Sequence, residues 1–224
     1  MKIRMYGFSV IEAIVVLVFL VFMFAIFLPM LGHVRHPARS NPNNMRVRGI
    51  HQSLVQFAQD NRGQYPGVDS KRKIFDATVE GRYELLLRGG WIESHYLVST
   101  YDEAKVNWEK GVVTTKNYSF SLPSIVFPAK GRKGEWRENL NTLAPIVTDR
   151  NIGRDHDEFV QSIHEGAEAG KWKGSVVWQD NHVSFEVRHV LETKLSKWEK
   201  NEADNLFVNE TEEGTDCYMI YTGQ

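Results

Sequence analysis

Several histidines and carboxylates in the C-terminal half are residue types that bind metal ions or transfer protons. Their spacing matches no common ligand set, because "HEGAE" lacks the second histidine of an HExxH zinc helix. No acidic loop has the spacing of a calcium site either, although calcium binding stays open. We therefore predict no metal and no cofactor, and expect Asp180 and His182 to hold a turn through side-chain-to-backbone hydrogen bonds. The residues in question are His156, His164, His182, His189, Asp155, Asp157, Glu165 and Asp180.

Motifs for nucleophilic or nucleotide chemistry are absent from the sequence. It contains no GxSxG elbow, no SxxK and no Cys/His pairing in a shared motif. Gly131 and Gly134 in "KGRKGEW" lie in a basic loop and do not open an apolar helix, so they do not form a phosphate-binding loop. Cys217 is the only cysteine, which excludes a disulfide within one chain. We predict that the protein is not an enzyme; a membrane-anchored hydrolase is a weak alternative.

Composition limits the partners. The chain has 224 residues, a length that fits one folded domain plus a membrane segment, and its net charge is −1. No lysine or arginine run is long enough to follow a phosphate backbone, so we expect no nucleic-acid partner.

The N-terminal region is dominated by one apolar segment, residues 8–31. Glu12 is the only ionisable residue between Phe8 and Leu31. At about 1.5 Å per residue, a helix of this length would span the ~30 Å hydrocarbon core of a bilayer. We therefore predict a transmembrane helix over 8–31, with the lipid bilayer as a partner. Basic residues occur on both sides of the segment, so the positive-inside rule does not decide its orientation.

Glu12 is costly in an apolar helix and calls for an explanation. If the leader "MKIRMYG" is cleaved after Gly7, Phe8 carries a new α-amino group one helical turn from Glu12, on the same face. The carboxylate could then pair with this amine or with that of a neighbouring subunit. The alternative is a carboxylate that simply reaches water at the membrane surface.

The stretch "GFSVIE" resembles the cleavage motif of type IV pilins and type II secretion pseudopilins. This resemblance implies prepilin peptidase cleavage between Gly7 and Phe8, N-methylation of Phe8, and a role for Glu12 in assembly. Pro29 matches a proline common in the same helix, and we expect it to kink or loosen that helix.

The remaining sequence predicts an α+β fold. Residues 32–44 form a Pro/Asn-rich break in which Asn43 or Asn44 caps the next helix. Apolar residues recur at helical spacing over 45–63, a short helix follows over 82–88, and period-two runs predict antiparallel strands within 112–122, 144–149, 175–179 and 182–188. We expect Val183, Phe185 and Val187 to face the core.

These segments define the predicted organisation. It comprises a leader (1–7), a transmembrane and assembly helix (8–31), the break (32–44), a pilin-like α+β domain (45–191) and a charged C-terminal tail (192–224). We expect the tail to begin as a solvated helix and to be mobile at its end. The predicted fold class is α+β and pilin-like, with a long N-terminal transmembrane helix followed by an amphipathic helix packed on an antiparallel β-sheet.

A second resemblance lies near the C-terminus. A histidine, a spacer and "DNHV" together look like the signature of a large bacterial pilin-like family, in which "DGHV" is usual. Here the signature residues are His164, Asp180, Asn181 and His182. Asn181 replaces glycine, and asparagine is the next best residue at left-handed backbone angles.

The two resemblances together imply a pseudopilin-like subunit. Its partners would be prepilin peptidase and other pilin or pseudopilin subunits. It would lie in the bacterial inner membrane with its C-terminal domain in the periplasm, and it would assemble into a pseudopilus or a type IV pilus-like filament. The alternative is a signal-anchored periplasmic binding protein that does not polymerise; it would keep its N-terminal residues.

Overall fold

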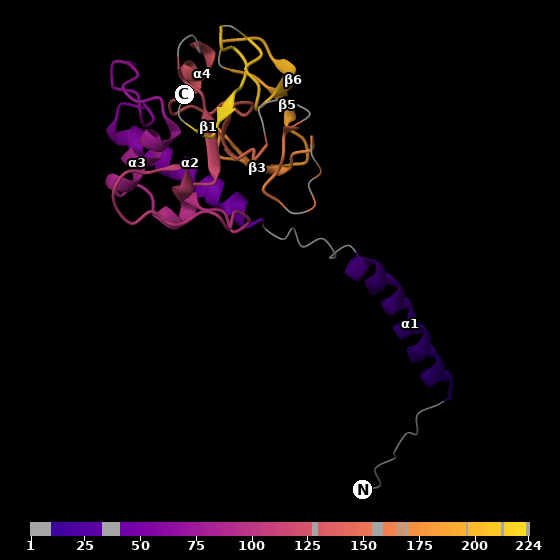
Figure 1. The fold of residues 1–224 in the computed structure, drawn as a ribbon. Coiled ribbons are helices and arrows are strands. Elements are labelled where there is room, and N and C mark those ends of the chain that lie inside the picture. Colours follow the sequence, from indigo (N-terminus) through magenta and orange to yellow (C-terminus); the bar gives the residue numbers. More distant parts are fainter. Residues whose placement is uncertain are drawn as a thin grey trace. The chain divides into compact units, whose positions relative to one another are not determined.

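The computed structural model describes residues 10–32, 41–126, 130–153, 159–164, 166, 168, 170–195, 197–211 and 213–222, and it describes no side chain at 21, 22 or 24–32. The chain divides into two compact units, Met1–Ser40 and Asn41–Gln224. Figure 1 follows the path of the chain through both units.

The first unit contains helix α1 (Val10–Gly32). In the part of the chain that the structure describes, no helix is both long and apolar enough to cross a membrane. The predicted transmembrane helix over 8–31 is therefore wrong.

Two further predictions concern this unit. Gly7 and Phe8 lie outside the described residues, so the cleavage site has no structural description. The backbone of α1 is helical through Pro29 to Gly32. The kink or loosening expected at Pro29 stays a prediction.

The second unit begins with helix α2 (Pro42–Asp60), the predicted amphipathic helix. It starts earlier than expected, because the side chain of Asn41, rather than Asn43 or Asn44, caps it by accepting a hydrogen bond from Asn43 N at 3.1 Å. At the other end Gly63 adopts a left-handed φ of 77°, and its N–H donates to the carbonyl of Ala58, as predicted for a helix stop.

Helix α2 packs across an antiparallel sheet. Among the described residues this sheet has five strands in the order β4-β3-β2-β1-β7. Their bounds are β1 (Phe120–Pro123), β2 (Pro145–Asp149), β3 (Gly174–Trp178), β4 (Val183–Glu186) and β7 (Met219–Ile220). Strands β2 and β3 lie centrally and are fully buried, whereas β4 forms one edge. The α+β class and the antiparallel sheet are thus confirmed.

Several short helices follow α2 along the chain. Helix α3 (Val79–Arg88) begins at the cap Thr78, whose hydroxyl accepts from Gly81 N, and it ends before Gly89-Gly90 as predicted. Two 3-10 turns, η2 (Ser94–Leu97) and η3 (Thr115–Asn117), lead to β1. The second occupies part of the predicted strand 112–122, so that strand is shorter than expected. Helix α4 (Lys130–Glu135) follows β1.

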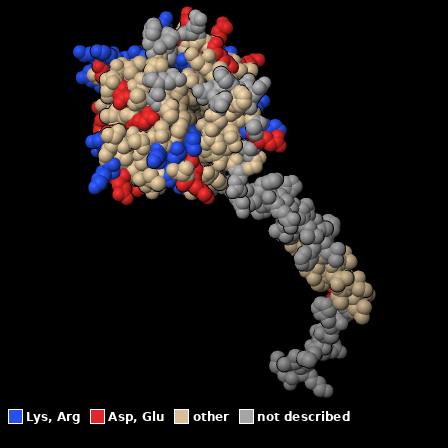
Figure 2. Space-filling model, in the orientation of Figure 1, with Lys and Arg blue, Asp and Glu red and all other residues tan. Residues whose placement is uncertain are grey.

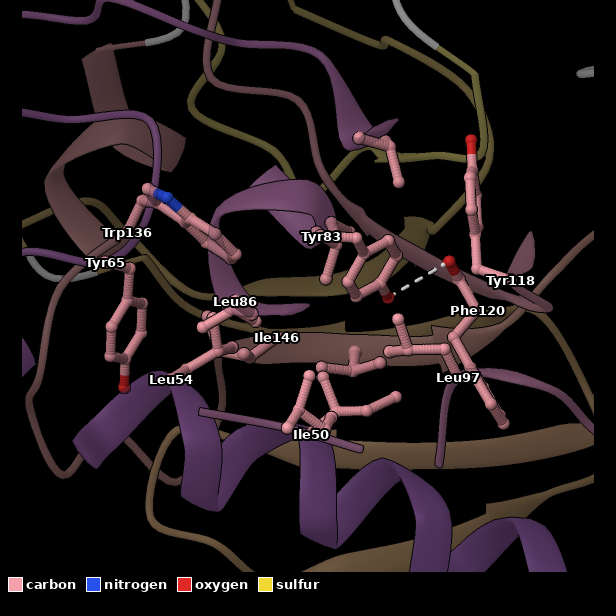
Figure 3. Close-up of a cluster of buried hydrophobic side chains, with 14 of the residues drawn as sticks. Ile50, Leu54, Tyr65, Tyr83, Leu86, Leu97, Tyr118, Phe120, Trp136 and Ile146 are labelled. Atoms are coloured by element: carbon pink, nitrogen blue, oxygen red, sulfur yellow. Dashed lines mark hydrogen bonds between the residues drawn. The ribbon is translucent and has the colours of Figure 1, made fainter. Parts of the chain in front are cut away.

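The main core lies between α2, α3 and the sheet. Figure 3 shows Ile50 and Leu54 of α2 directed into it, beside Leu86 of α3 and Ile146 of β2. All four are fully buried. In the same view Tyr83 donates a hydrogen bond from its hydroxyl to the carbonyl of Phe120, at 3.2 Å, so this buried polar atom is satisfied.

Two predictions for the C-terminal half are wrong. Strand β4 does not bury one clean face, because Phe185 is 40% exposed and Val187 is 74% exposed at the sheet edge. The charged segment after residue 191 is not a helical, loosely held tail. It supplies β5 (Val190–Thr193), its partner β6 (Asn201–Asn205), and β7 of the main sheet. Its apolar residues Leu206, Phe207 and Met219 form a second core with Trp172.

Candidate functional site

The signature residue His164 lies in a buried polar network. Its Nε2 is 2.8 Å from Oδ2 of Asp149, at the end of β2, and Ser175 N donates to the same oxygen at 2.7 Å. Asn43 of α2 donates to the other oxygen, Oδ1, at 2.6 Å. Asp149 and Asn43 are fully buried. One carboxylate therefore joins the first turn of α2, two sheet strands and the loop that carries His164.

The His164 ring also has aromatic neighbours on both sides. Its centroid lies 4.5 Å from that of Tyr101 and 5.1 Å from that of Phe185 on β4. Ser99 extends the network by donating from its hydroxyl to Asn43 Oδ1 at 2.9 Å. These contacts make His164 a packing and hydrogen-bonding residue.

The other signature residues form the turn between β3 and β4. Asn181 has a φ of 68°, the left-handed conformation predicted for it. Asp180 Oδ1 accepts from His182 N at 3.1 Å and lies 2.5 Å from His182 Nδ1. The prediction that Asp180 and His182 hold the turn is therefore confirmed. The His182 ring also stacks on Trp178, with centroids 5.4 Å apart.

The two parts of the signature, His164 and the turn 180–182, contact different residues. His164 contacts Asp149, and the turn contacts α2 through His51, whose Nδ1 is 3.1 Å from the side-chain oxygen Oδ1 of Asn181. Sequence reasoning missed Asp149, His51 and Gln179. The available signals were weak: Asp149 ends an apolar run, and His51 occurs on the apolar side of an amphipathic helix.

Gln179 fixes the orientation of the His51 network. Its Nε2 donates to the carbonyls of Glu135 and Arg137 at 2.5 and 2.8 Å, so its Oε1 faces inward. The Tyr65 hydroxyl donates to this Oε1 at 2.8 Å, and His51 Nε2 lies 3.3 Å from it. Because Oε1 only accepts, Nε2 of His51 carries hydrogen.

Burial shifts the pKa values of these groups. His51 is 2% exposed, and loss of solvation lowers its pKa, while its hydrogen bonds to Asn181 and Gln179 act in the opposite direction. Loss of solvation also raises the pKa of the Tyr65 hydroxyl above its ordinary value, so this hydroxyl remains a donor.

A cavity of about 510 Å³ opens beside this turn. It is lined by α2 between His51 and Gln56, by residues 138–140 and by residues 179–181. The carboxylates are Glu138 and Asp180, and the apolar contributors are Val55 and Leu140. The lining contains no lysine or arginine. Its chemistry suits a cationic group carried on an apolar stem.

Metal binding finds no support in the described part of the chain, where no group of three or more His, Cys, Asp or Glu side chains could hold an ion. The candidates Asp155, His156, Asp157 and Glu165 lie outside the described residues. His189 is buried on the ring of Phe207, at 6.5 Å between centroids. Cys217 is a buried free thiol, and burial raises its pKa.

The assembly residue Glu12 lies in the first turn of α1. Ile11, Ile14 and Val15, which lie near it on this helix, are each more than half exposed.

Comparison of the chain with protein-family models, with curated proteins and with solved structures found no match.

Proposed function

We propose that this chain is a pilin-like (pseudopilin) subunit that a prepilin peptidase cleaves between Gly7 and Phe8 and that assembles into a filament. It would be processed at the bacterial inner membrane, with the unit Asn41–Gln224 in the periplasm. In this proposal its role is structural and not enzymatic.

The observation that carries the proposal is the N-terminal pattern. A short basic leader ends in Gly7, an aromatic residue follows, and Glu12 comes four positions later in an apolar run. In the structure Glu12 is in the first turn of α1, where a carboxylate is favoured by the helix dipole. An amine at Phe8 would be one turn away.

The exposed apolar surface of α1 supports the same proposal. The described side chains from Val10 to Leu20 are all exposed, and most are large and apolar. Such a surface is typical of an interaction site. Similar helices from neighbouring subunits would cover it, and the Glu12 carboxylate would pair with the Phe8 amine of a neighbour. At a separation of about 4 Å and an effective dielectric constant of about 20, the Coulomb attraction of such a pair is about 4 kcal/mol, before the cost of removing both charges from water.

The first experiment is the intact mass and the N-terminal peptide of the protein from its own cells. We expect a chain beginning at Phe8, with or without one added methyl group. A Gly7→Val variant, with a branched side chain at the cleavage site, serves as the unprocessed reference. A wild-type chain that keeps "MKIRMYG" would refute the proposal and favour the alternative, a binding protein that does not polymerise.

Assembly is tested separately with Glu12. We expect Glu12→Ala to be cleaved but to be lost from the filament fraction at least tenfold, because the Phe8 amine then has no partner. Glu12→Asp, which keeps the charge, should retain part of the assembly. Normal assembly of Glu12→Ala would show that the carboxylate does not register the subunits.

A further inference from the structure

We propose that the loop tip 69–73 of one copy of this chain binds in the cavity beside the 179–182 turn of a second copy. The inference rests on the proposed filament function, because it supplies a contact between the compact units of neighbouring subunits. It uses two surfaces that the processing and assembly of α1 leave unexplained.

The loop tip is a preformed basic projection. The Asp69 carboxylate accepts from Lys71 N and Lys73 N, each at 2.8 Å, and Arg72 N donates to the Asp69 carbonyl at 2.9 Å. A β-bridge between Val68 and Ile74 closes its base. Because the backbone is already ordered, binding would cost little conformational entropy.

The side-chain types at this tip indicate an acidic or polar partner. Lys71, Arg72 and Lys73 are all exposed. Arg72 adopts a φ of 63°, a conformation that glycine or asparagine occupies at lower cost. An arginine at such a position favours a function for its guanidinium group.

The cavity has the complementary chemistry. Glu138 is exposed, and the Asp180 side chain is 23% exposed, so both carboxylates can be reached. The base of the cavity is formed by the buried His51 ring and the Gln179 side chain, and no lysine or arginine lines it. A guanidinium group offers five donors, which the two carboxylates and the amides of Gln52 and Gln56 can accept.

Apolar surface accompanies the charges on both sides. Leu140 at the cavity is 83% exposed, and Phe75, two residues beyond the tip, is 60% exposed. Large apolar side chains that flank a charged contact exclude water and strengthen it. The stem of Arg72 would pack on Val55 and Leu140, as arginine stems do on apolar surfaces.

A second copy is favoured over an unrelated basic partner, because tip and cavity occur on one chain in complementary form. Lysine and arginine residues are interspersed with acidic ones on the face of the compact unit that Figure 2 shows. A contact between two different surfaces of identical chains is heterologous, and such contacts build filaments or rings.

The test uses two variants of the full chain in detergent, examined by sedimentation equilibrium. The tip variant is Lys71→Ala/Arg72→Ala/Lys73→Ala, and the cavity variant is Glu138→Gln/Asp180→Asn. We expect wild type to self-associate, and each variant alone to show at least a tenfold lower association constant. Mixing the two should restore association, but only to one-to-one dimers, because each variant keeps one intact surface. Glu109→Gln/Lys110→Ala, at two exposed charged positions outside both surfaces, should behave as wild type.

Several results would overturn the inference: a wild type that stays monomeric, a cavity variant that associates normally, or a mixture that forms no dimers. An unchanged urea midpoint shows that each variant is folded. Should one variant unfold, oxidative cross-linking of Arg72→Cys with Leu140→Cys replaces it: a disulfide dimer supports the contact, and none opposes it. Cleavage at Phe8 is read by mass, so the failure of this contact and the failure of the proposed function give different results.

Discussion

Replacement of His164 by alanine tests whether this signature residue is a structural junction. The variant removes the ring that binds Asp149 Oδ2 at 2.8 Å and that lies between Tyr101 and Phe185. Asp149 is fully buried, so no bulk water replaces the lost hydrogen bond. The carboxylate would keep its bonds to Asn43 and Ser175.

The expected loss of stability follows from these contacts. A hydrogen bond to a charged group contributes about 1.5–3 kcal/mol, and each aromatic contact about 0.5–1.5 kcal/mol. We therefore expect His164→Ala to lower the free energy of unfolding by about 3–5 kcal/mol. For a unit of this size, each kcal/mol lowers the Tm by about 2–4 °C, so the Tm should fall by roughly 6–20 °C.

The assay is urea unfolding at neutral pH, followed by tryptophan fluorescence. His182→Ala is the matched control: its side chain is 47% exposed, and the loss should stay below about 1 kcal/mol. His164→Gln keeps a donor for Asp149 and should fall between His164→Ala and wild type. If His164→Ala lowers the free energy of unfolding no more than His182→Ala does, the contacts of His164 with Asp149, Tyr101 and Phe185 do not stabilise the fold.

Two further predictions concern the buried Asp204 and the turn residue Asn181. Burial raises the pKa of Asp204 to about 6, so the folded state binds a proton that the unfolded state has released, and this group lowers stability as the pH rises from about 4 to about 6. Asp204→Asn should remove this component, so wild type should lose about 2 kcal/mol more stability than the variant between pH 4.5 and pH 7, as measured by urea unfolding. Equal pH dependence of the two proteins would refute the assignment. Asn181→Gly should change stability by less than about 1 kcal/mol, because glycine adopts the φ of 68° freely, whereas Asn181→Ala should cost about 1–2 kcal/mol more in thermal unfolding; a more stable alanine variant would contradict the turn geometry.

Local features were predictable because local physics decides them. The period of apolar residues identified α2, the Gly89-Gly90 pair ended α3, and Asp180-Asn181 marked the hairpin turn. Each depends on residues within a few positions of one another, where backbone preferences and side-chain spacing dominate. The N-terminal cap was misplaced by two or three residues, because Asn41, Asn43 and Asn44 are all good capping residues.

The candidate site was only partly predictable. Its turn was found from the sequence, but Asp149, His51 and Gln179 were not, since each gains its role from a residue far along the chain. The transmembrane helix was predicted from hydropathy and is not found among the described residues. The C-terminal segment was misread because its many charges suggested a solvated tail, whereas its scattered apolar residues pair into strands and a core.

The sequence by itself determined the apolar N-terminal segment, the amphipathic helix, the strand-turn-strand motif and the motif around Gly7 and Glu12. Tertiary structure alone decided that β7 joins β1, that one buried carboxylate connects α2 to the sheet, and that a cavity with two carboxylates lies beside the turn. The reason is physical: a residue's preference for helix, strand or turn acts over a few positions, whereas burial and buried hydrogen bonds depend on which distant segments the whole chain brings together.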